Sequence, residues 1–212
     1  MNRRLMLKQV GALAALSAVA PTVLAQQSQF VTLPSKLEGD SPDKIEVIEF
    51  FHYGCPHCKD FDPLLNTWLK SVPEDVAFRR VPAIWGNAQL RELARLYYTI
   101  ETTDHIETLH EAVFPAVQTQ RRPLHTEEGV RAWVAGFSGV DASAFMDTYK
   151  SFGLQAMLQR ADQLARAYRV QGVPTMAVGG RYVTSASMTG SHVNALKMVD
   201  ELIVKARSER TG

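Results

Sequence analysis

The strongest constraint on the fold is an apolar strand that runs directly into a pair of cysteines. Residues 44–52 are predicted to form this strand, and apolar side chains occur on both of its faces. Such a strand belongs in the centre of a covered sheet. Cys55-Pro56-His57-Cys58 follows almost at once and opens a helix predicted over residues 56–70. The chain is therefore expected to build an α/β sheet with two thiols at the end of a central strand.

The two cysteines have no other partner within the chain. Cys55 and Cys58 are the only two among 212 residues, so an intramolecular disulfide can only join them to each other. A Cys-x-x-Cys between a strand and a helix is typical of a redox dithiol. The apolar content of 46% is enough for a core without structural disulfides, so in an exported protein this pair is expected to serve reactivity.

The order of the remaining elements predicts an insertion. A short strand over 30–33 comes first, and a strand over 77–81 completes a parallel βαβ unit. A two-residue hairpin turn, Gly179-Gly180, joins strands over 175–178 and 181–184, and a helix over 194–205 closes the chain. A plain βαβ–ββα domain needs one helix before this hairpin, but about 90 residues stand there. Helices are expected over 87–102, 105–114 and 153–169, and after Thr126 and Asp141.

We therefore predict an α/β, thioredoxin-like fold with an inserted all-helical subdomain. The thioredoxin-like domain is assigned to residues 26–85 and 168–212, and the helical subdomain to residues 86–167. Trp68, Trp133 and the tyrosines at helical spacing are expected in the core.

Residues 1–25 have the pattern of a signal peptide. Arg3, Arg4 and Lys8 precede a short apolar run, and Val23-Leu24-Ala25 predicts cleavage after Ala25. The run is shorter than the roughly 20 residues that a membrane anchor needs. The alternative is an amphipathic N-terminal helix, and the pattern leaves Sec and twin-arginine export both open. Export would place the protein in the periplasm.

The charge balance argues against nucleic acid as a partner. The chain has 23 basic and 22 acidic residues, and cleavage after Ala25 would leave 20 basic and 22 acidic ones. Neither a basic field for nucleic acid nor a polybasic membrane patch is present.

The cysteine motif itself predicts a direction of reaction. Cys55 is expected at the helix N-cap, where unpaired N–H groups and the helix dipole favour a thiolate. Pro56 suits the first helical position, and a protonated His57 would add positive charge beside the sulfur. Stabilising the reduced thiolate makes the disulfide a stronger oxidant. Cys58, one turn into the helix, is expected to be buried and to act as the resolving thiol.

Other uses of the cysteines fit less well. A structural disulfide across one helical turn would close a very small loop and constrain the unfolded chain little. Zinc needs four ligands, and His52 and His57 are not completed by a second Cys-x-x-Cys or a paired histidine motif. Lys59 follows Cys58 where c-type haem attachment requires histidine, so no metal site and no separate cofactor are expected.

The sequence resembles the DsbA family of bacterial periplasmic thiol:disulfide oxidoreductases. The resemblance rests on Glu49-Phe50-Phe51 before Cys55-Pro56-His57-Cys58, on the long helical insertion, and on Gly172-Val173-Pro174-Thr175, and it covers essentially the whole chain after residue 25. It implies a monomeric oxidase of newly exported proteins that carry free cysteines. It also implies reoxidation by a DsbB-like inner-membrane partner.

By this resemblance Glu49 corresponds to a buried acid beneath the active site. It would relay a proton to or from Cys58, since a carboxylate inside an apolar strand is costly without a partner or a role. The alternative is a strand-end acid that reaches solvent or pairs with Arg79 or Arg80. Arg80 is a weak candidate for the basic partner that family members often carry on the next strand.

Val173 and Pro174 are the predicted substrate-binding residues. A lone proline before a strand is usually only a loop marker, but thioredoxin-like folds keep a cis proline facing the dithiol at this place. A cis bond would expose the backbone of Val173, so that an extended substrate could pair beside the sulfurs. Valine at this position resembles the oxidases more than the isomerases, which usually carry threonine.

The other histidines show no ligand pattern. His52 is interpreted as a polar residue at a strand end. His105, His110, His125 and His192 are expected to be surface or capping residues.

The predicted function is donation of the Cys55–Cys58 disulfide to exported proteins through a mixed disulfide at Cys55. One alternative is a periplasmic reductase or isomerase. A second is a non-redox, DsbA-like protein that binds peptides or a metal ion.

Overall fold

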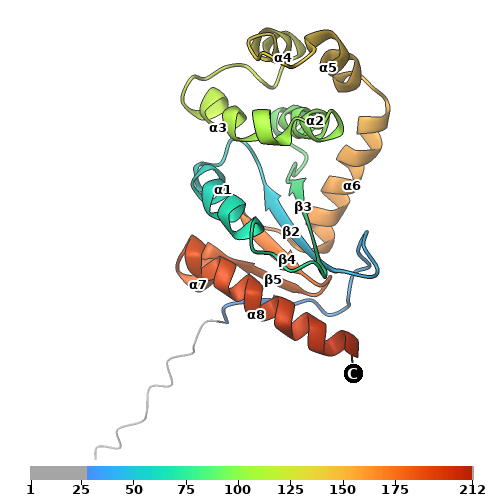
Figure 1. The fold of residues 1–212 in the computed structure, drawn as a ribbon, viewed down its shortest axis with the longest axis vertical. Helices are drawn as coiled ribbons and strands as arrows, with labels where there is room; N and C mark the ends of the chain where they lie inside the picture. The colour runs from blue at the N-terminus through green and yellow to red at the C-terminus, as the bar shows by residue number, and fades with distance from the viewer. Residues whose placement is uncertain (1–27, 212) are drawn as a thin grey trace, which may run out of the picture.

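The computed structural model describes residues 28–211, and a five-stranded sheet in the order β1-β5-β4-β2-β3 forms its centre (Figure 1). β2 (Ile45–Phe51) lies inside this sheet, and all seven of its residues are buried. The prediction of a covered central strand is confirmed. The predicted signal peptide, residues 1–25, lies outside the described residues.

The βαβ unit forms as predicted. β2 continues through the dithiol into α1 (Pro56–Leu69), and β3 (Val76–Pro82) returns parallel to β2. In this register Glu49 stands opposite Arg80, and Ile48 stands opposite Arg79. Glu46 and Glu49 of β2 therefore lie on the strand next to Arg79 and Arg80 of β3.

The hairpin follows on the other side of β2. β4 (Thr175–Val178) runs antiparallel to β2, and β5 (Tyr182–Ser185) pairs with both β4 and β1 (Val31–Thr32). The prediction of a two-residue turn is wrong: Val178 pairs with Tyr182, so three residues connect the strands. Gly180 has φ +73°, and a Cβ there would lie 2.1 Å from the Leu37 carbonyl oxygen. Because the backbone at Leu37 lies so close to Gly180, only glycine fits at this position between β4 and β5.

Helices cover the sheet and extend beyond it. α1 and α8 (His192–Thr211) pack together and α8 also contacts β4 and β5, while α6 (Gly153–Ala167) contacts β3 and α2. The remaining helices gather above the dithiol end of β2 (Figure 1). They are α2 (Ala88–Thr102), the π-helical turn η1 (Ile106–His110), α3 (Glu111–Gln118), α4 (Glu127–Val134) and α5 (Ala142–Tyr149). The short helix α7 (Ala186–Thr189) was not predicted.

The predicted helix starts agree with the caps. The side chains of Asn87, Thr126 and Asp141 accept hydrogen bonds from backbone N–H groups in the first turns of α2, α4 and α5. One helix differs. The helix expected over 105–114 begins as a π-helical turn, and it continues as α3 to Gln118.

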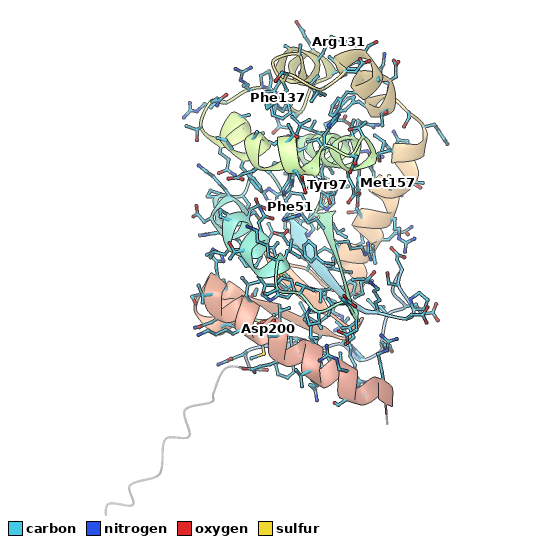
Figure 2. All side chains as sticks on the ribbon, in the orientation of Figure 1. Phe51, Tyr97, Arg131, Phe137, Met157 and Asp200 are labelled. Carbon is cyan, nitrogen blue, oxygen red and sulfur yellow. The ribbon has the colours of Figure 1, made fainter. Side chains whose placement is uncertain are left out.

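The hydrophobic core continues from the sheet into the helical layer. One cluster joins Ile48 and Phe50 of β2 to residues of α2 through α6, and a second joins the opposite face of the sheet to α1 and α8. Figure 2 shows Phe51 and Tyr97 where β2 meets α2. Their ring centroids lie 5.1 Å apart. The end of β2 is therefore packed against the helical layer. Within residues 28–211, no helix has both the length and the apolar content to cross a membrane.

Candidate active site

The dithiol occupies the N-terminus of α1, as the sequence predicts. Cys55 is the N-cap residue with extended backbone angles, and Pro56 is the first helical residue. Both cysteines are unpaired, so the structure describes the reduced form. Cys55 retains 9% exposure whereas Cys58 has 0%. Only one of the two sulfurs can therefore meet an incoming substrate.

The two thiols have opposite acidities. The pKa of Cys55 falls to about 6, because the Cys58 thiol and the backbone N–H groups of His57 and Cys58 hydrogen-bond to its sulfur, and the charge of His57 adds to this effect. Burial, the hydrogen bond to Cys55 and the nearby charge of Glu49 raise the pKa of Cys58 well above that of an ordinary thiol. Near neutral pH, Cys55 is thus a thiolate and Cys58 keeps its proton.

The loop before β4 faces the exposed sulfur. The Val173–Pro174 peptide bond is cis. The Cys55 Sγ lies 3.4 Å from the carbonyl oxygen of Val173 and in its thiol form donates a hydrogen bond to it. Two predicted site residues, separated by more than a hundred positions in sequence, are therefore in direct contact.

Glu49 is buried under the site and paired with a basic residue. Its exposure is 2%, and the Nε of Arg80 lies 3.1 Å from its Oε2. Arg80 is the basic partner, and Arg79 instead forms a pair with Glu46 at 2.9 Å. The strand alternation explains this division, because neighbouring residues of β3 point to opposite faces of the sheet.

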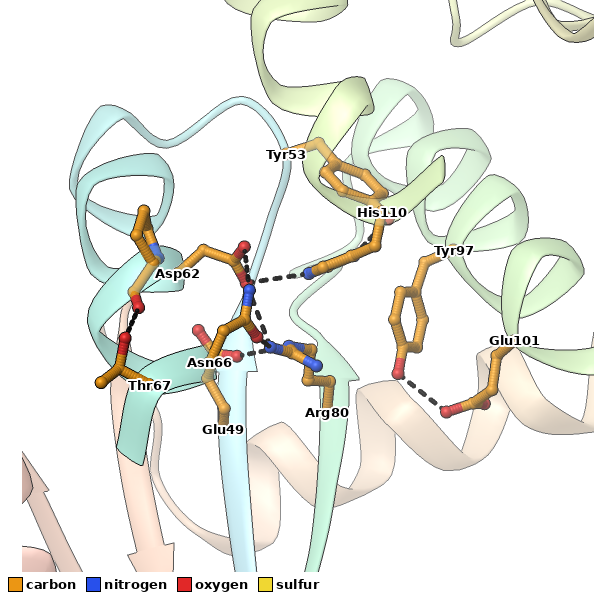
Figure 3. A network of polar contacts seen from close by, with 10 residues as sticks. Glu49, Tyr53, Asp62, Asn66, Thr67, Arg80, Tyr97, Glu101 and His110 are labelled. Carbon is orange, nitrogen blue, oxygen red and sulfur yellow. Dashed lines mark hydrogen bonds and ion pairs between the residues drawn. The ribbon is translucent and has the colours of Figure 1, made fainter. Parts of the chain in front are cut away.

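A second carboxylate shares the same arginine. The Nη2 of Arg80 lies 3.1 Å from Oδ1 of Asp62 on α1, and the Nε2 of His110 on η1 lies 3.2 Å from that oxygen. On its other side, the Nδ1 of His110 is 2.7 Å from the hydroxyl of Tyr53. Figure 3 shows these contacts as one continuous network. We call Glu49, Asp62, Arg80 and His110 the inner ionic cluster.

His110 corrects the sequence-based interpretation. It was expected at the surface or in a cap, but it is only 3% exposed. The sequence pattern does not predict Asp62 as a site residue either. Both lie in helices with apolar neighbours, and neither has a motif that marks it. The one feature of the sequence that could have indicated Asp62 is its position one helical turn after Cys58.

The cluster gives its two carboxylates opposite proton affinities. Burial raises the pKa of Glu49 to about 7 against the attraction of Arg80, and the charge of Asp62 adds to the rise. Burial acts on Asp62 as well, but the hydrogen bond from His110 and the charges around it outweigh this effect and lower its pKa. Burial lowers the pKa of His110. Near neutral pH Glu49 is therefore only partly ionised and can exchange a proton, whereas Asp62 is ionised.

A residue of the helical layer holds the active-site turn. The amide of Gln118, the last residue of α3, donates hydrogen bonds to the carbonyl oxygens of Tyr53 at 2.8 Å and Cys55 at 3.0 Å. These carbonyls belong to the turn between β2 and α1, and the turn lies beyond the residues of β2 that pair with β3 and β4. The helical layer above the sheet thus contributes directly to the shape of the site.

A groove opens next to the exposed sulfur. It has a volume of about 900 Å³ and runs between residues 168–175, β5, α7 and β1. His57, Val173 and Pro174 line the part that meets the dithiol. Its other apolar walls are Val31, Leu33, Val170, Val183 and Met188. The groove therefore reaches the dithiol through Val173, whose carbonyl oxygen contacts the Cys55 sulfur.

Two further histidines flank the dithiol. The ring of His52 packs against Trp85, with centroids 5.9 Å apart, and the ring of His192 lies 6.2 Å from that of His57. The Nδ1 atoms of His52 and His192 are buried and have no hydrogen-bond partner within residues 28–211. Burial lowers the pKa of both rings. His57 itself is exposed.

Comparisons with known proteins agree with this site. The DSBA-like thioredoxin domain model matches residues 74–197. The thiol:disulfide interchange protein DsbA of Bordetella parapertussis is 42% identical over 198 residues, which cover 92% of this chain and 93% of that protein. The protein of the same name from Pseudomonas aeruginosa is 38% identical and covers 85% of this chain and 84% of its own.

Solved structures show the same fold. The crystal structure of Pseudomonas aeruginosa DsbA matches with a TM-score of 0.83 at 37% identity, covering 87% of this chain and 95% of that one. The oxidoreductase DsbA from Xylella fastidiosa matches with a TM-score of 0.76 at 29% identity, covering 85% and 96%. The predicted thioredoxin-like fold and the predicted resemblance are confirmed, and the chain belongs to the DsbA family of thiol:disulfide oxidoreductases.

Proposed function

We propose that the chain donates a disulfide between Cys55 and Cys58 to substrate proteins that carry free thiols. The observation that supports oxidation of the substrate, rather than its reduction, is the difference in exposure and pKa between the two cysteines. Cys55 is the more exposed and strongly acidified sulfur, and Cys58 is buried and holds its proton. Because a stable Cys55 thiolate favours the reduced protein, the oxidised protein is a good oxidant.

The reaction proceeds in two exchanges. A substrate thiolate attacks the Cys55 sulfur, the bond between the two cysteines breaks, and Cys58 leaves with the electron pair. The protonated carboxyl of Glu49 supplies the proton that Cys58 takes up. A second substrate thiolate then attacks the substrate's own sulfur in the mixed disulfide, and Cys55 leaves as a thiolate. The substrate loses two electrons, and Glu49 regains its proton from water.

Substrate recognition is assigned to the backbone of Val173 and to the adjoining groove. The carbonyl oxygen of Val173 lies 3.4 Å from the Cys55 sulfur, so it stands where an extended substrate strand could pair with the Val173 backbone beside that sulfur. The groove walls are largely apolar. Such a surface suits unfolded segments, because backbone pairing and apolar contact depend little on sequence.

The first test uses variants that interrupt the two exchanges. Cys58→Ala is expected to accumulate mixed disulfides with substrate proteins, which nonreducing electrophoresis displays as bands that reductant removes. Cys55→Ala is the matched control and should form none. If Cys58→Ala yields no mixed disulfides from the exporting cell, the mechanism through Cys55 is wrong.

The second test is the equilibrium of the purified dithiol with glutathione. A strongly oxidising couple supports disulfide donation. A potential near that of reducing thioredoxins would favour a reductase, and full biological activity of Cys55→Ser would favour a non-redox role in binding peptides or metal ions. An isomerase would instead be expected to reshuffle wrong disulfides in a scrambled substrate.

The wider setting is proposed on the same basis. We propose a monomer that works in the periplasm after cleavage near Ala25, needs no cofactor beyond its own disulfide, and is reoxidised by a DsbB-like membrane partner. We also propose the division into residues 26–85 and 168–212 with residues 86–167 inserted. The gathering of α2 through α5 above the dithiol supports this division (Figure 1).

A further inference from the structure

The inner ionic cluster contains more negative than positive partners. Glu49 and Asp62 are both buried, and both contact the single guanidinium of Arg80. Two carboxylates that share one cation cannot both be ionised without an uncompensated buried charge, which is costly. One proton near neutral pH therefore belongs to this cluster, and its position depends on which carboxylate is better supported.

The hydrogen bonds favour Asp62 as the ionised member. Besides Arg80, its oxygens accept from the side-chain amide of Asn66 at 2.9 Å and face the Nε2 of His110 at 3.2 Å. A carboxylate only accepts, so the Nε2 of His110 carries the hydrogen. Its Nδ1 then accepts from the hydroxyl of Tyr53, and every member of the chain is satisfied with a neutral imidazole. Glu49 has Arg80 as its one side-chain partner in the described chain.

The groups that face the cluster from neighbouring elements support this assignment. Glu49 on β2 faces Arg80 on β3 and Asp62 on α1, and its charge acts on Cys58 of α1. From α2, the hydroxyl of Tyr97 donates a hydrogen bond to Glu101 at 2.7 Å (Figure 3). Tyr97 and Tyr53 act electrostatically on Arg80. No second cation among the described residues contacts Glu49 or Asp62.

We propose that Asp62 and His110 are positioning residues of the exchange reaction: they hold one edge of the Arg80 guanidinium, so that Glu49 receives only part of its charge and carries the proton of the cluster. This inference rests on the proposed role of Glu49 as the proton donor to Cys58. It assigns to η1, an element of the helical layer, a part in the proton transfer. Without the Asp62 carboxylate, Glu49 would be the one acidic partner of Arg80 in the cluster, and Asn66 would remain a neutral acceptor of the guanidinium.

The central experiment removes the competing charge. In the reduced protein, titration of the Glu49 carboxyl is followed by carbon NMR of labelled glutamate side chains, with Glu49→Gln identifying the signal. In Asp62→Asn the midpoint is expected to fall by about one pH unit or more, since a like charge disappears and Arg80 turns to Glu49. Asp60→Asn, which removes an exposed carboxylate from the same helix, should leave the midpoint unchanged.

His110 provides a second pair of variants if Asp62→Asn does not fold. Gln can donate to Asp62 as the imidazole does, whereas Leu cannot. His110→Gln is expected to keep the midpoint of Glu49, and His110→Leu to lower or broaden it because Asp62 then competes for the proton. Equal midpoints in His110→Leu and the parent protein would overturn the role of His110.

A kinetic readout separates this inference from the function on which it rests. A drop of one unit in the Glu49 midpoint lowers its protonated fraction at pH 8 about tenfold, and the rate of mixed-disulfide formation by the oxidised protein should fall accordingly. If Glu49→Gln leaves that rate and its pH profile unchanged, the proton-donor role fails. If the midpoint in Asp62→Asn stays where it is, the positioning role fails, whatever Glu49→Gln does.

Discussion

Two ionic clusters lie at the β2–β3 boundary, and they differ in their balance of charge. The inner cluster has Glu49 and Asp62 around one arginine, fully enclosed below the dithiol. The outer ionic cluster comprises Asp40, Glu46, Arg79 and Arg160. There Arg79 contacts both acids, and Arg160 contacts Asp40 at the surface. Two acids thus face two arginines.

The comparison separates a cluster built for stability from one built for chemistry. The same strand pair supplies Glu46 with Arg79 on one face and Glu49 with Arg80 on the other. A balanced and partly exposed cluster has no reason to hold a proton. A buried cluster with a surplus of carboxylates must hold one, and it does so next to Cys58, whose pKa is raised. The two clusters contain the same number of acidic residues, and the inner cluster differs from the outer one in having only one arginine to balance them.

The largest effect is expected from removing each arginine in turn. Arg80→Met would leave two buried carboxylates without a cation and should lower the free energy of unfolding by about 3 kcal/mol or more. Arg79→Met removes a partner from Glu46 nearer to solvent and should cost about 1–2 kcal/mol. Urea unfolding of both reduced variants measures the difference. Equal losses would mean that the two clusters do not differ in kind.

The pH dependence of stability comes next in size. Between its ordinary pKa of 4.5 and about 7, Glu49 keeps its proton in the folded protein and has lost it in the unfolded chain. The folded state therefore loses stability as pH rises through this window, by about 3 kcal/mol in total. Cys55 acts in the opposite sense, since its lowered pKa adds stability as pH rises from about 6 toward 9.

Glu49→Gln isolates the contribution of Glu49. The difference in unfolding free energy between this variant and the parent protein, measured from pH 4.5 to 8, should shift in favour of the variant as pH rises. Glu46→Gln is the matched control on the same strand and should retain the loss of stability that Glu49 causes. A difference curve that is flat for Glu49→Gln would contradict the assignment of the buried proton.

A smaller effect tests how far the inner cluster reaches. Hydrogen bonds from Cys58 and from the helix N-terminus lead the causes that lower the pKa of Cys55, and His57 contributes through its charge. His57→Ser should raise the alkylation midpoint of Cys55 from about 6 by less than about one unit. Glu49→Gln should leave it in place. A large shift in Glu49→Gln would show that the cluster acts on both sulfurs.

The smallest effect belongs to the edge of the outer cluster. Arg160 is exposed and pairs with the exposed Asp40, so Arg160→Gln should cost less than about 1 kcal/mol. Whatever it costs should shrink in high salt, because exposed charges are screened. Unfolding at low and high ionic strength measures this, with the salt-independent loss in Arg80→Met as the contrast.

The sequence predicted the parts of the site that are local in the chain. The strand, the turn and the helix N-terminus follow from a contiguous run, so the geometry of Cys55 and Cys58 could be derived from it. Glu49 stood out because a carboxylate inside an apolar strand needs an explanation. Val173 and Pro174 were placed only with the help of the resemblance, since nothing local connects them to the cysteines.

The missed residues depend on tertiary packing. Asp62, His110 and Gln118 reach the site from helices whose spacing only indicates which face is apolar. A polar residue within such a pattern is expected at the surface unless its partner is known, and the partner of His110 lies 48 positions away. The hairpin loop also escaped prediction, because its length depends on which residues of β4 and β5 pair.

The π-helical turn η1 has a consequence for how such a site can change over evolutionary time. A π turn closes with one residue more than an α turn. Loss of one codon in this turn would rotate the residues on either side of it relative to each other by about 100°. His110 ends the turn and Gln118 ends the helix that continues from it. A single deletion within the turn would therefore rotate His110 and Gln118 together relative to α2, and would disturb the support of the buried proton and the support of the cysteine turn at once.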